Sequence, residues 1–147
     1  MFHWMNLIDE DKVKNKSVAV AVTHDHAHVF LLNDESTAPI AIVRRAEPEN
    51  IHVRSAQAHH GHASENGEVN YFADLSSHIQ NASSVLLLGH GTGKANAAER
   101  FSHYLRDHQK AIAIKVLALE TVNLPALSNG EIVHEAHRKW RELVSRS

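Results

Sequence analysis

The residues Ser84-Val-Leu-Leu-Leu-Gly-His-Gly-Thr-Gly-Lys94 give the clearest structural signal in the chain. A short apolar run bounded by turn residues is typical of a strand that is buried on both faces, and the glycines that follow it predict a tight turn. Beyond the turn, Ala97, Phe101 and Leu105 recur at helical spacing. A buried strand that leads through a turn into a helix is the repeating unit of an α/β sheet.

The segment before this unit reads as an antiparallel meander over residues 17–45. Ser17–Thr23 and Ala27–Leu32 are short apolar runs on either side of His24-Asp25-His26, which predicts a hairpin. Pro39–Arg44 supplies a third strand, and Ile51–Arg54 is expected to add a short edge strand.

Helices and strands alternate in the rest of the chain. Phe72, Leu75 and Ile79 predict a helix after a loop over residues 58–67, with Ser64 or Asn66 as its N-cap. A parallel strand is expected over residues 112–119, and Ser128 with Glu131 three residues later forms a capping box for a last helix. The sequence therefore predicts an α/β, ribonuclease-H-like three-layer fold. The strand order 3-2-1-4-5 is usual for the mixed sheet of this architecture.

Length and composition predict one globular domain. The 147 residues are 43% hydrophobic and 22% charged, as in folded proteins, and we expect a flexible arm at 1–16 followed by a domain at 17–147. The absence of cysteine excludes disulfides and thiolate metal sites. The apolar start is too short for a signal peptide or a membrane span, so a cytoplasmic protein with no membrane partner is expected.

The charge of the chain argues against a non-specific DNA coat. The formal net charge is −2 with neutral histidines, whereas such proteins carry an obvious basic stripe. Fourteen histidines modify this interpretation, because their ordinary pKa lies near 6.5 and mild acid adds positive charge.

The glycine-rich turn is a candidate anion site. It joins a buried strand to a helix, where backbone N–H groups and a lysine can hold an anion. The spacing from Gly89 to Gly93 is one residue short of a P-loop, and Ala95 replaces the hydroxyl residue that would hold magnesium. We therefore expect no nucleotide cofactor. The predicted anion-binding residues are Gly89, Gly91, Gly93 and Lys94.

A second hypothesis is a small metal- or anion-dependent enzyme. The predicted sheet order brings the carboxyl ends of two strands together, so that His24, Asp25 and Lys94 converge on a crevice. A ribonuclease H needs several carboxylates there to hold two metals, and Asp25 is the one clear candidate. Histidines at 24, 26 and 28 and at 59, 60 and 62 suit transition metals. Dense surface histidines without nearby carboxylates favour solvent, RNA or protein contact instead, so neither a metal site nor a catalytic residue is assigned.

The order of these segments resembles a known family, the bacterial translational-machinery proteins related to the central domain of eukaryotic and archaeal peptide-chain release factors. The resemblance runs from about residue 17 to residue 144. The segments that carry it are Val18–Phe30, His59–His62, Leu86–Lys94, Leu119–Pro125 and Glu131–Ala136.

The resemblance implies a role in translation without peptide release. Residues 58–64 occupy the position of the loop that carries Gly-Gly-Gln in release factors, and they read Ala-His-His-Gly-His-Ala-Ser. A ribosome- or RNA-contacting, non-catalytic domain is therefore expected, with ribosomal RNA or a translation factor as partner. Its predicted contact residues are His59, His60, His62, Lys94 and Arg100. An apolar edge strand or the arm around Trp4 could also mediate homo-oligomerisation.

Overall fold

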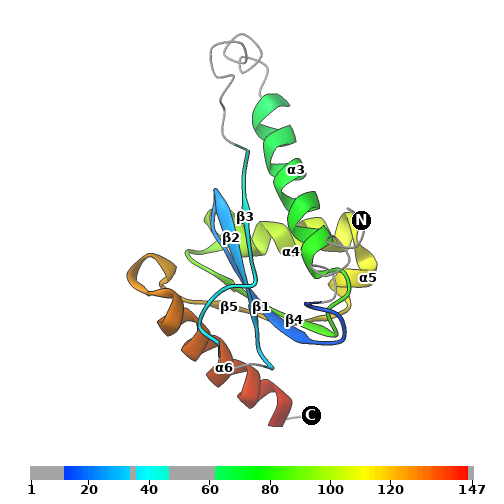
Figure 1. Cartoon of the computed structure of the whole chain (residues 1–147). Helices are drawn as coiled ribbons and strands as arrows, with labels where there is room; N and C mark the ends of the chain where they lie inside the picture. The colour runs from blue at the N-terminus through cyan, green and yellow to red at the C-terminus, as the bar shows by residue number, and fades with distance from the viewer. Residues whose placement is uncertain (1–11, 34–35, 47–61, 146–147) are drawn as a thin grey trace, which may run out of the picture.

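The sheet has the predicted topology. The computed structural model describes residues 12–33, 36–46 and 62–145, with the backbone alone for residues 62–66. Five strands lie in the order β3-β2-β1-β4-β5 (Figure 1). The first three are antiparallel, whereas β4 and β5 run parallel to β1. This confirms the ribonuclease-H-like mixed sheet. The strands are β1 Ser17–Val22, β2 His26–Leu31, β3 Ala41–Arg44, β4 Ser84–Gly89 and β5 Val116–Thr121.

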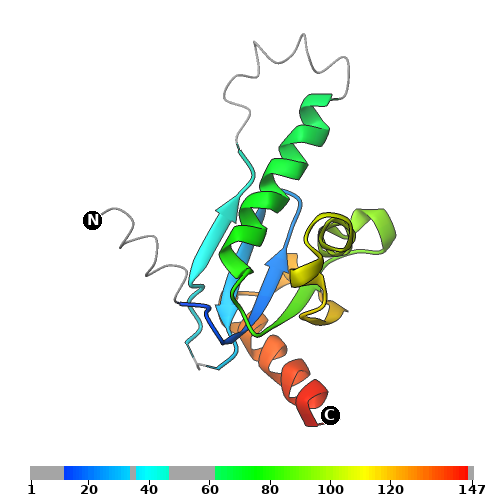
Figure 2. The same cartoon turned by 90° about the vertical axis from the view of Figure 1, so that its right-hand side faces the viewer.

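Helices cover both faces of the sheet. Two long helices, α3 and α4, and the short α5 lie on one face, and α6 lies on the other (Figure 2). None of the helices in the described residues is both long and apolar enough to cross a bilayer. The helical segments are α3 His62–Ile79, η1 Gly93–Ala95, α4 Ala97–His108, α5 Lys110–Ala113, η2 Leu124–Ala126 and α6 Asn129–Ser145.

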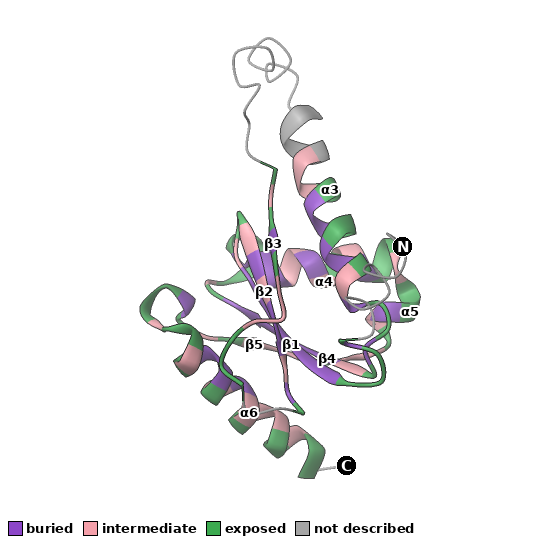
Figure 3. Ribbon diagram, viewed as in Figure 1, coloured by how far each residue is buried: buried purple, intermediate pink, exposed green. Residues whose placement is uncertain are grey.

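The central strand β1 divides the interior into two cores. Val18, Val20 and Val22 point toward α3 and α4, whereas Ala19 and Ala21 point toward α6. All six residues of β1 are buried (Figure 3). Burial on both faces explains why the strand reads as a continuous apolar run rather than an alternating one.

The expected strand over residues 112–119 is wrong in its first half. Residues 110–113 form α5, and β5 begins only at Val116. The chain makes helical turns here, in which the N–H of Ile112 donates to Gln109 and that of Lys115 donates to Ile112. Ile112 is buried while Ile114 is 85% exposed, so the alternation of apolar residues reflects a turn rather than a strand.

Two helix starts test the capping predictions. Ser128 N–H donates to Glu131 Oε1 (2.9 Å), and Glu131 N–H donates to Ser128 Oγ (3.2 Å), which confirms the capping box. Helix α3 begins at His62, so the N-cap expected at Ser64 or Asn66 is wrong, and residues 62–67 of the predicted loop over residues 58–67 are helical. Residues 58–61 lie outside the described residues. The expected edge strand 51–54 lies outside the described residues.

The segment before β1 is attached to the body from residue 12 onward. Val13 is buried against the α3 side of the sheet. The N–H of Asn15 donates to the carbonyl of Asn81, and the N–H of Ser83 donates to that of Lys16. The rest of the expected arm, including Trp4, lies outside the described residues.

Candidate functional site at the carboxyl end of the sheet

Several segments meet where the parallel strands end. Strands β1 and β4 are neighbours, as the predicted crevice requires. Because Arg44 pairs with His26, the end of β3 and the start of β2 lie at the same edge. The turn after β4 leads into η1 and α4, and the N-terminal turns of α3 extend beyond this edge, away from the sheet (Figures 1 and 2).

The glycine-rich turn is built around a buried asparagine. Gly91 and Gly93 have φ angles of 94° and 56°, which glycine adopts without steric cost. Asn96 Oδ1 accepts hydrogen bonds from the N–H groups of Ala98 (3.0 Å) and Glu99 (3.2 Å). Its Nδ2 donates to the carbonyl of Gly91 (3.2 Å). The first N–H donors of α4 are therefore used inside the chain, which leaves the turn and Lys94 for the predicted anion site.

Arg100 connects three segments at this edge. Its Nε–H donates to Glu68 Oε1 of α3 (2.8 Å), and its Nη1 donates to the carbonyl of Lys94. The side chains of Arg100 and Glu68 are 26% and 29% exposed, so this ion pair is partly shielded from water. Arg100 thus holds α3 beside the turn, while Lys94 is exposed.

Tyr71 attaches α3 to the turn between β1 and β2. Its hydroxyl donates to the carbonyl of Thr23 (3.0 Å), and the residue is almost fully buried. Burial strongly raises the pKa of Tyr71, and the negative charge of Asp25 raises it further. Arg45 and Arg100 act in the opposite direction. The phenol therefore stays protonated and serves as a hydrogen-bond donor.

Asp25 is already engaged within its own turn. A hydrogen bond of 2.9 Å joins its Oδ1 to His26 Nδ1, and the hydroxyl of Thr23 lies 3.1 Å from the same oxygen. The hydrogen bond to His26 is the main cause that lowers the pKa of Asp25. A carboxylate that is 74% exposed with a lowered pKa is a weak general base.

The enzyme hypothesis gains no support from this geometry. Among the described residues, no ion pair joins Lys94 to Asp25. The same residues hold no group of three His, Cys, Asp or Glu side chains able to bind a metal ion. His59 and His60 lie outside the described residues, and the side chain of His62 is not described, so their predicted role stays a prediction.

Sequence reasoning missed the arginines at the end of β3. The guanidinium of Arg45 lies against the first turns of α3, since a Cβ atom on Gly67 would be 3.3 Å from its Nη2. Arg44 is exposed and pairs with His26 across the strands. The sequence contained this signal. The third strand of an antiparallel meander runs in the same direction as the first, so residues at the end of β3 must lie at the same edge as the end of β1.

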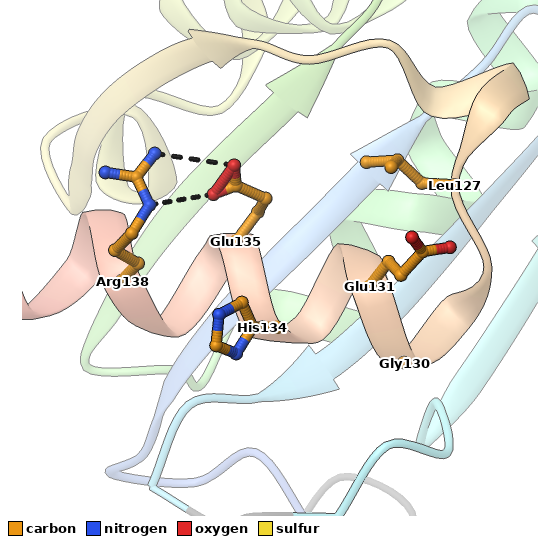
Figure 4. A pocket seen from close by; sticks show the side chains of 6 residues that line it. All are labelled: Leu127, Gly130, Glu131, His134, Glu135 and Arg138. Atoms are coloured by element: carbon orange, nitrogen blue, oxygen red, sulfur yellow. Dashed lines mark hydrogen bonds and ion pairs between the residues drawn. The ribbon is translucent and has the colours of Figure 1, made fainter.

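The outer surface of α6 carries a pocket of about 410 Å³ whose charges are paired locally. Arg138 donates to Glu135 (2.9 Å) and to Glu142 (3.0 Å) within the same helix, and Figure 4 shows the first of these pairs. Ion pairs between exposed side chains of one helix contribute little to stability, because solvent screens them. Because Arg138 already has two carboxylate partners, this pocket is a weaker candidate for an anionic ligand.

His28 bridges β2 and the start of α6. Its Nδ1 hydrogen-bonds to Asn129 Oδ1 (3.2 Å), and its ring contacts those of His26 and Phe30. Burial is the first cause that lowers the pKa of His28, and the charges of His26 and Arg44 lower it further. The neutral ring is therefore favoured in the folded protein.

This lowered pKa predicts acid sensitivity. The unfolded chain protonates near the ordinary pKa of about 6.5, whereas folded His28 resists protonation. Stability should therefore be lost as pH falls from about 7.5 through that value toward the folded pKa. We expect the free energy of unfolding of His28→Gln, measured by urea denaturation, to fall less than that of the wild type over this range. His103→Gln, on an exposed site of α4, is the matched control, and equal pH dependence in all three proteins would contradict the prediction.

Comparison with known proteins gives a structural likeness but no family. No protein-family model matches the sequence, and no curated protein matches it. The crystal structure of Pelota from Archaeoglobus fulgidus is similar, with a TM-score of 0.47 and 14% sequence identity. The likeness covers 99% of this chain and 42% of that chain, so this protein spans less than half the length of Pelota.

Proposed function

We propose that this domain acts in translation by contacting ribosomal RNA, without a catalytic step of its own. The supporting observation is the gathering of permanent cations at one edge. Arg44 ends β3 and Arg45 follows it, Lys94 lies in the turn after β4, and Arg100 lies in the first turn of α4. These four residues are called the carboxyl-end surface. Lysine and arginine at one edge, beside a projecting helix, suit contact with an irregular phosphate backbone.

Two further points support RNA as the partner. The carboxylate of Glu68 is paired with Arg100, which reduces its repulsion of phosphate. The chain also enters α3 at its projecting end directly from the segment that contains His59 and His60. Imidazole rings can stack on unpaired bases, and on protonation they attract phosphate. The resemblance of the sequence to release-factor central domains agrees with this role.

The proposal is tested by co-sedimentation with ribosomes over about 50 to 200 mM salt. Lys94→Ala should weaken the association and reduce the slope of log K against log salt by about one. Lys110→Ala is the matched control, because Lys110 is an exposed lysine on α5, which precedes β5 and so lies at the opposite edge. If the wild type does not pellet with ribosomes at the lowest salt, the proposal fails. If it pellets but Lys94→Ala behaves like Lys110→Ala, Lys94 has no part in the contact.

A combined replacement of His59, His60 and His62 by alanine tests the histidine segment. Ribosome association of the wild type should strengthen as pH falls from about 7.5 to 6, where unperturbed histidines gain charge, and that of the triple variant should strengthen less. Equal behaviour of both proteins at the two pH values would remove these residues from the contact.

We also expect no release of peptide from ribosome-bound peptidyl-tRNA above a no-protein control, because residues 58–64 contain no glutamine.

A further inference from the structure

A crevice of about 360 Å³ lies on the α6 face of the sheet, between the start of β2, η2 and the start of α6. It is separate from the turn after β4, and it has two chemically different walls. One wall is polar and comes from the β1–β2 turn, β2 and the first residue of α6: Thr23, Asp25, His26, His28 and Asn129. The other is mainly apolar and comes from η2 and the segment around it: Leu124, Pro125, Leu127 and Ile132.

The polar wall offers flat rings with fixed orientations. The ring centroids of His26 and His28 are 5.2 Å apart, and Phe30 lies beyond His28 at 6.0 Å. One nitrogen of each imidazole makes a hydrogen bond. Nδ1 of His26 is bonded to Asp25, and Nδ1 of His28 is bonded to Asn129. Both rings are only half-buried, so part of each remains accessible. Rings held in this way can stack on a planar ligand at little entropic cost.

The apolar wall and the surrounding charges restrict the class of ligand. Leu124 and Ile132 are nearly buried and form a hydrophobic floor. The carboxylate of Asp25 in the rim disfavours a bare phosphate inside the crevice, whereas it can accept hydrogen bonds from ring and exocyclic N–H groups. Arg44 is exposed, faces the same side of the sheet as His26 and is available to a phosphate outside.

We propose that this crevice binds one unpaired nucleobase of an RNA strand, which inserts between the imidazole of His28 and the apolar wall while its phosphate lies near Arg44. The inference deepens the proposed function, since it rests on this domain contacting RNA. A base matches the site because it is flat, apolar on its faces and polar at its edge. Stacking on aromatic rings tolerates any base, so little sequence preference is expected from His28 itself.

The test is fluorescence anisotropy of the full chain with a fluorescein-labelled single-stranded RNA of eight adenosines. An abasic strand of the same length serves as the second probe. The wild type should bind the adenosine strand more tightly than the abasic one, because only the former supplies a base. Equal affinity for the two strands would show phosphate binding alone and would overturn the proposal.

Three variants assign the effect to His28. His28→Ala should weaken binding of the adenosine strand about tenfold, and His28→Phe, which keeps a ring, should remain within roughly threefold of the wild type. His103→Ala, on the opposite face, should bind like the wild type. If His28→Ala binds like His103→Ala, the crevice is not the site. Equal losses in His28→Phe and His28→Ala would overturn stacking. Thermal unfolding midpoints of the variants confirm that each is folded at the assay temperature.

The outcomes separate this inference from the proposed function. His28→Ala should weaken ribosome association but keep the salt slope of the wild type, because it removes a base stack and no cation that contacts phosphate. Weaker binding of both the octamer and the ribosome, with an unchanged salt slope, therefore supports the crevice. Ribosome association without any preference for the adenosine strand would refute the crevice and leave the proposed function standing.

Discussion

Replacing Gly89 by alanine is expected to destabilise the protein by about 3 kcal/mol. An added Cβ would lie 1.9 Å from Asn96 Oδ1 and 2.7 Å from the Cβ of Ala98, so one of these neighbours has to move. Asn96 is only 1% exposed and caps α4, so a displacement of its side chain breaks the capping hydrogen bonds. Loss of the cap costs about 1 kcal/mol, and overpacking adds about 1–3 kcal/mol.

Urea denaturation of Gly89→Ala and Gly130→Ala measures this effect. Gly130 is the matched control, because a Cβ there would meet only Ser128 Oγ and Thr37 Cγ2, both at 3.9 Å. Alanine inside a helix is favoured over glycine by about 1 kcal/mol, so this variant should be as stable as the wild type or more stable. The double variant Gly89→Ala with Asn96→Ala should lose less than the sum of the single losses, because the clashing oxygen is gone. A loss below about 1 kcal/mol in Gly89→Ala would contradict the packing described here.

The result also bears on the proposed RNA contact. Lys94 is carried by a turn whose shape depends on two positive φ angles and on the hydrogen bond from Asn96 to Gly91. If Gly89→Ala displaces Asn96, the position of Lys94 changes although its charge is kept. Weakened ribosome association in a variant that remains folded would then show that the geometry of the turn matters in addition to its charge.

Local patterns were sufficient to predict most of the fold. The continuous apolar runs of β1 and β4 predicted strands buried on both faces, and the Ser128–Glu131 pair predicted the start of the last helix. These features depend on neighbours in sequence. The α5–β5 boundary was misassigned because Ala111–Leu119 is apolar except for Lys115, and such a run does not distinguish a helical turn from a buried strand.

The site was only partly predictable because its contacts join distant residues. Arg100 meets Glu68 across 32 positions, Tyr71 meets Thr23 across 48, and His28 meets Asn129 across 101. Each of these contacts depends on where a helix crosses the sheet, which no local pattern specifies. The sequence placed Lys94 beside the end of β4, but it did not indicate that Asn96 occupies the helix start or that Arg100 is paired.

Replacing Phe72 by alanine is expected to destabilise the protein by about 3–5 kcal/mol, the largest effect predicted. Phe72 is only 3% exposed, and its ring centroid lies 5.2 Å from that of Phe101 and 5.7 Å from that of Tyr104. These rings join α3 to α4, so alanine leaves a cavity between the two helices. The cost combines lost burial with lost aromatic contacts, because the backbone of α3 and α4 can close the space only in part.

Urea denaturation again provides the measurement, with Val69→Ala as the matched control. Val69 precedes Phe72 by one turn of α3 and is 48% exposed, so its truncation should cost less than about 1 kcal/mol. Phe72→Leu should fall between the two, since it keeps most of the buried apolar surface. Equal losses in Phe72→Ala and Val69→Ala would mean that the contacts of Phe72 with Phe101 and Tyr104 do not stabilise the protein. If the rings of Phe72, Phe101 and Tyr104 hold α3 in place, Phe72→Leu should also weaken ribosome association at a temperature where the variant is folded. The reason is that the projecting end of α3 would then be positioned less firmly beside the carboxyl-end surface.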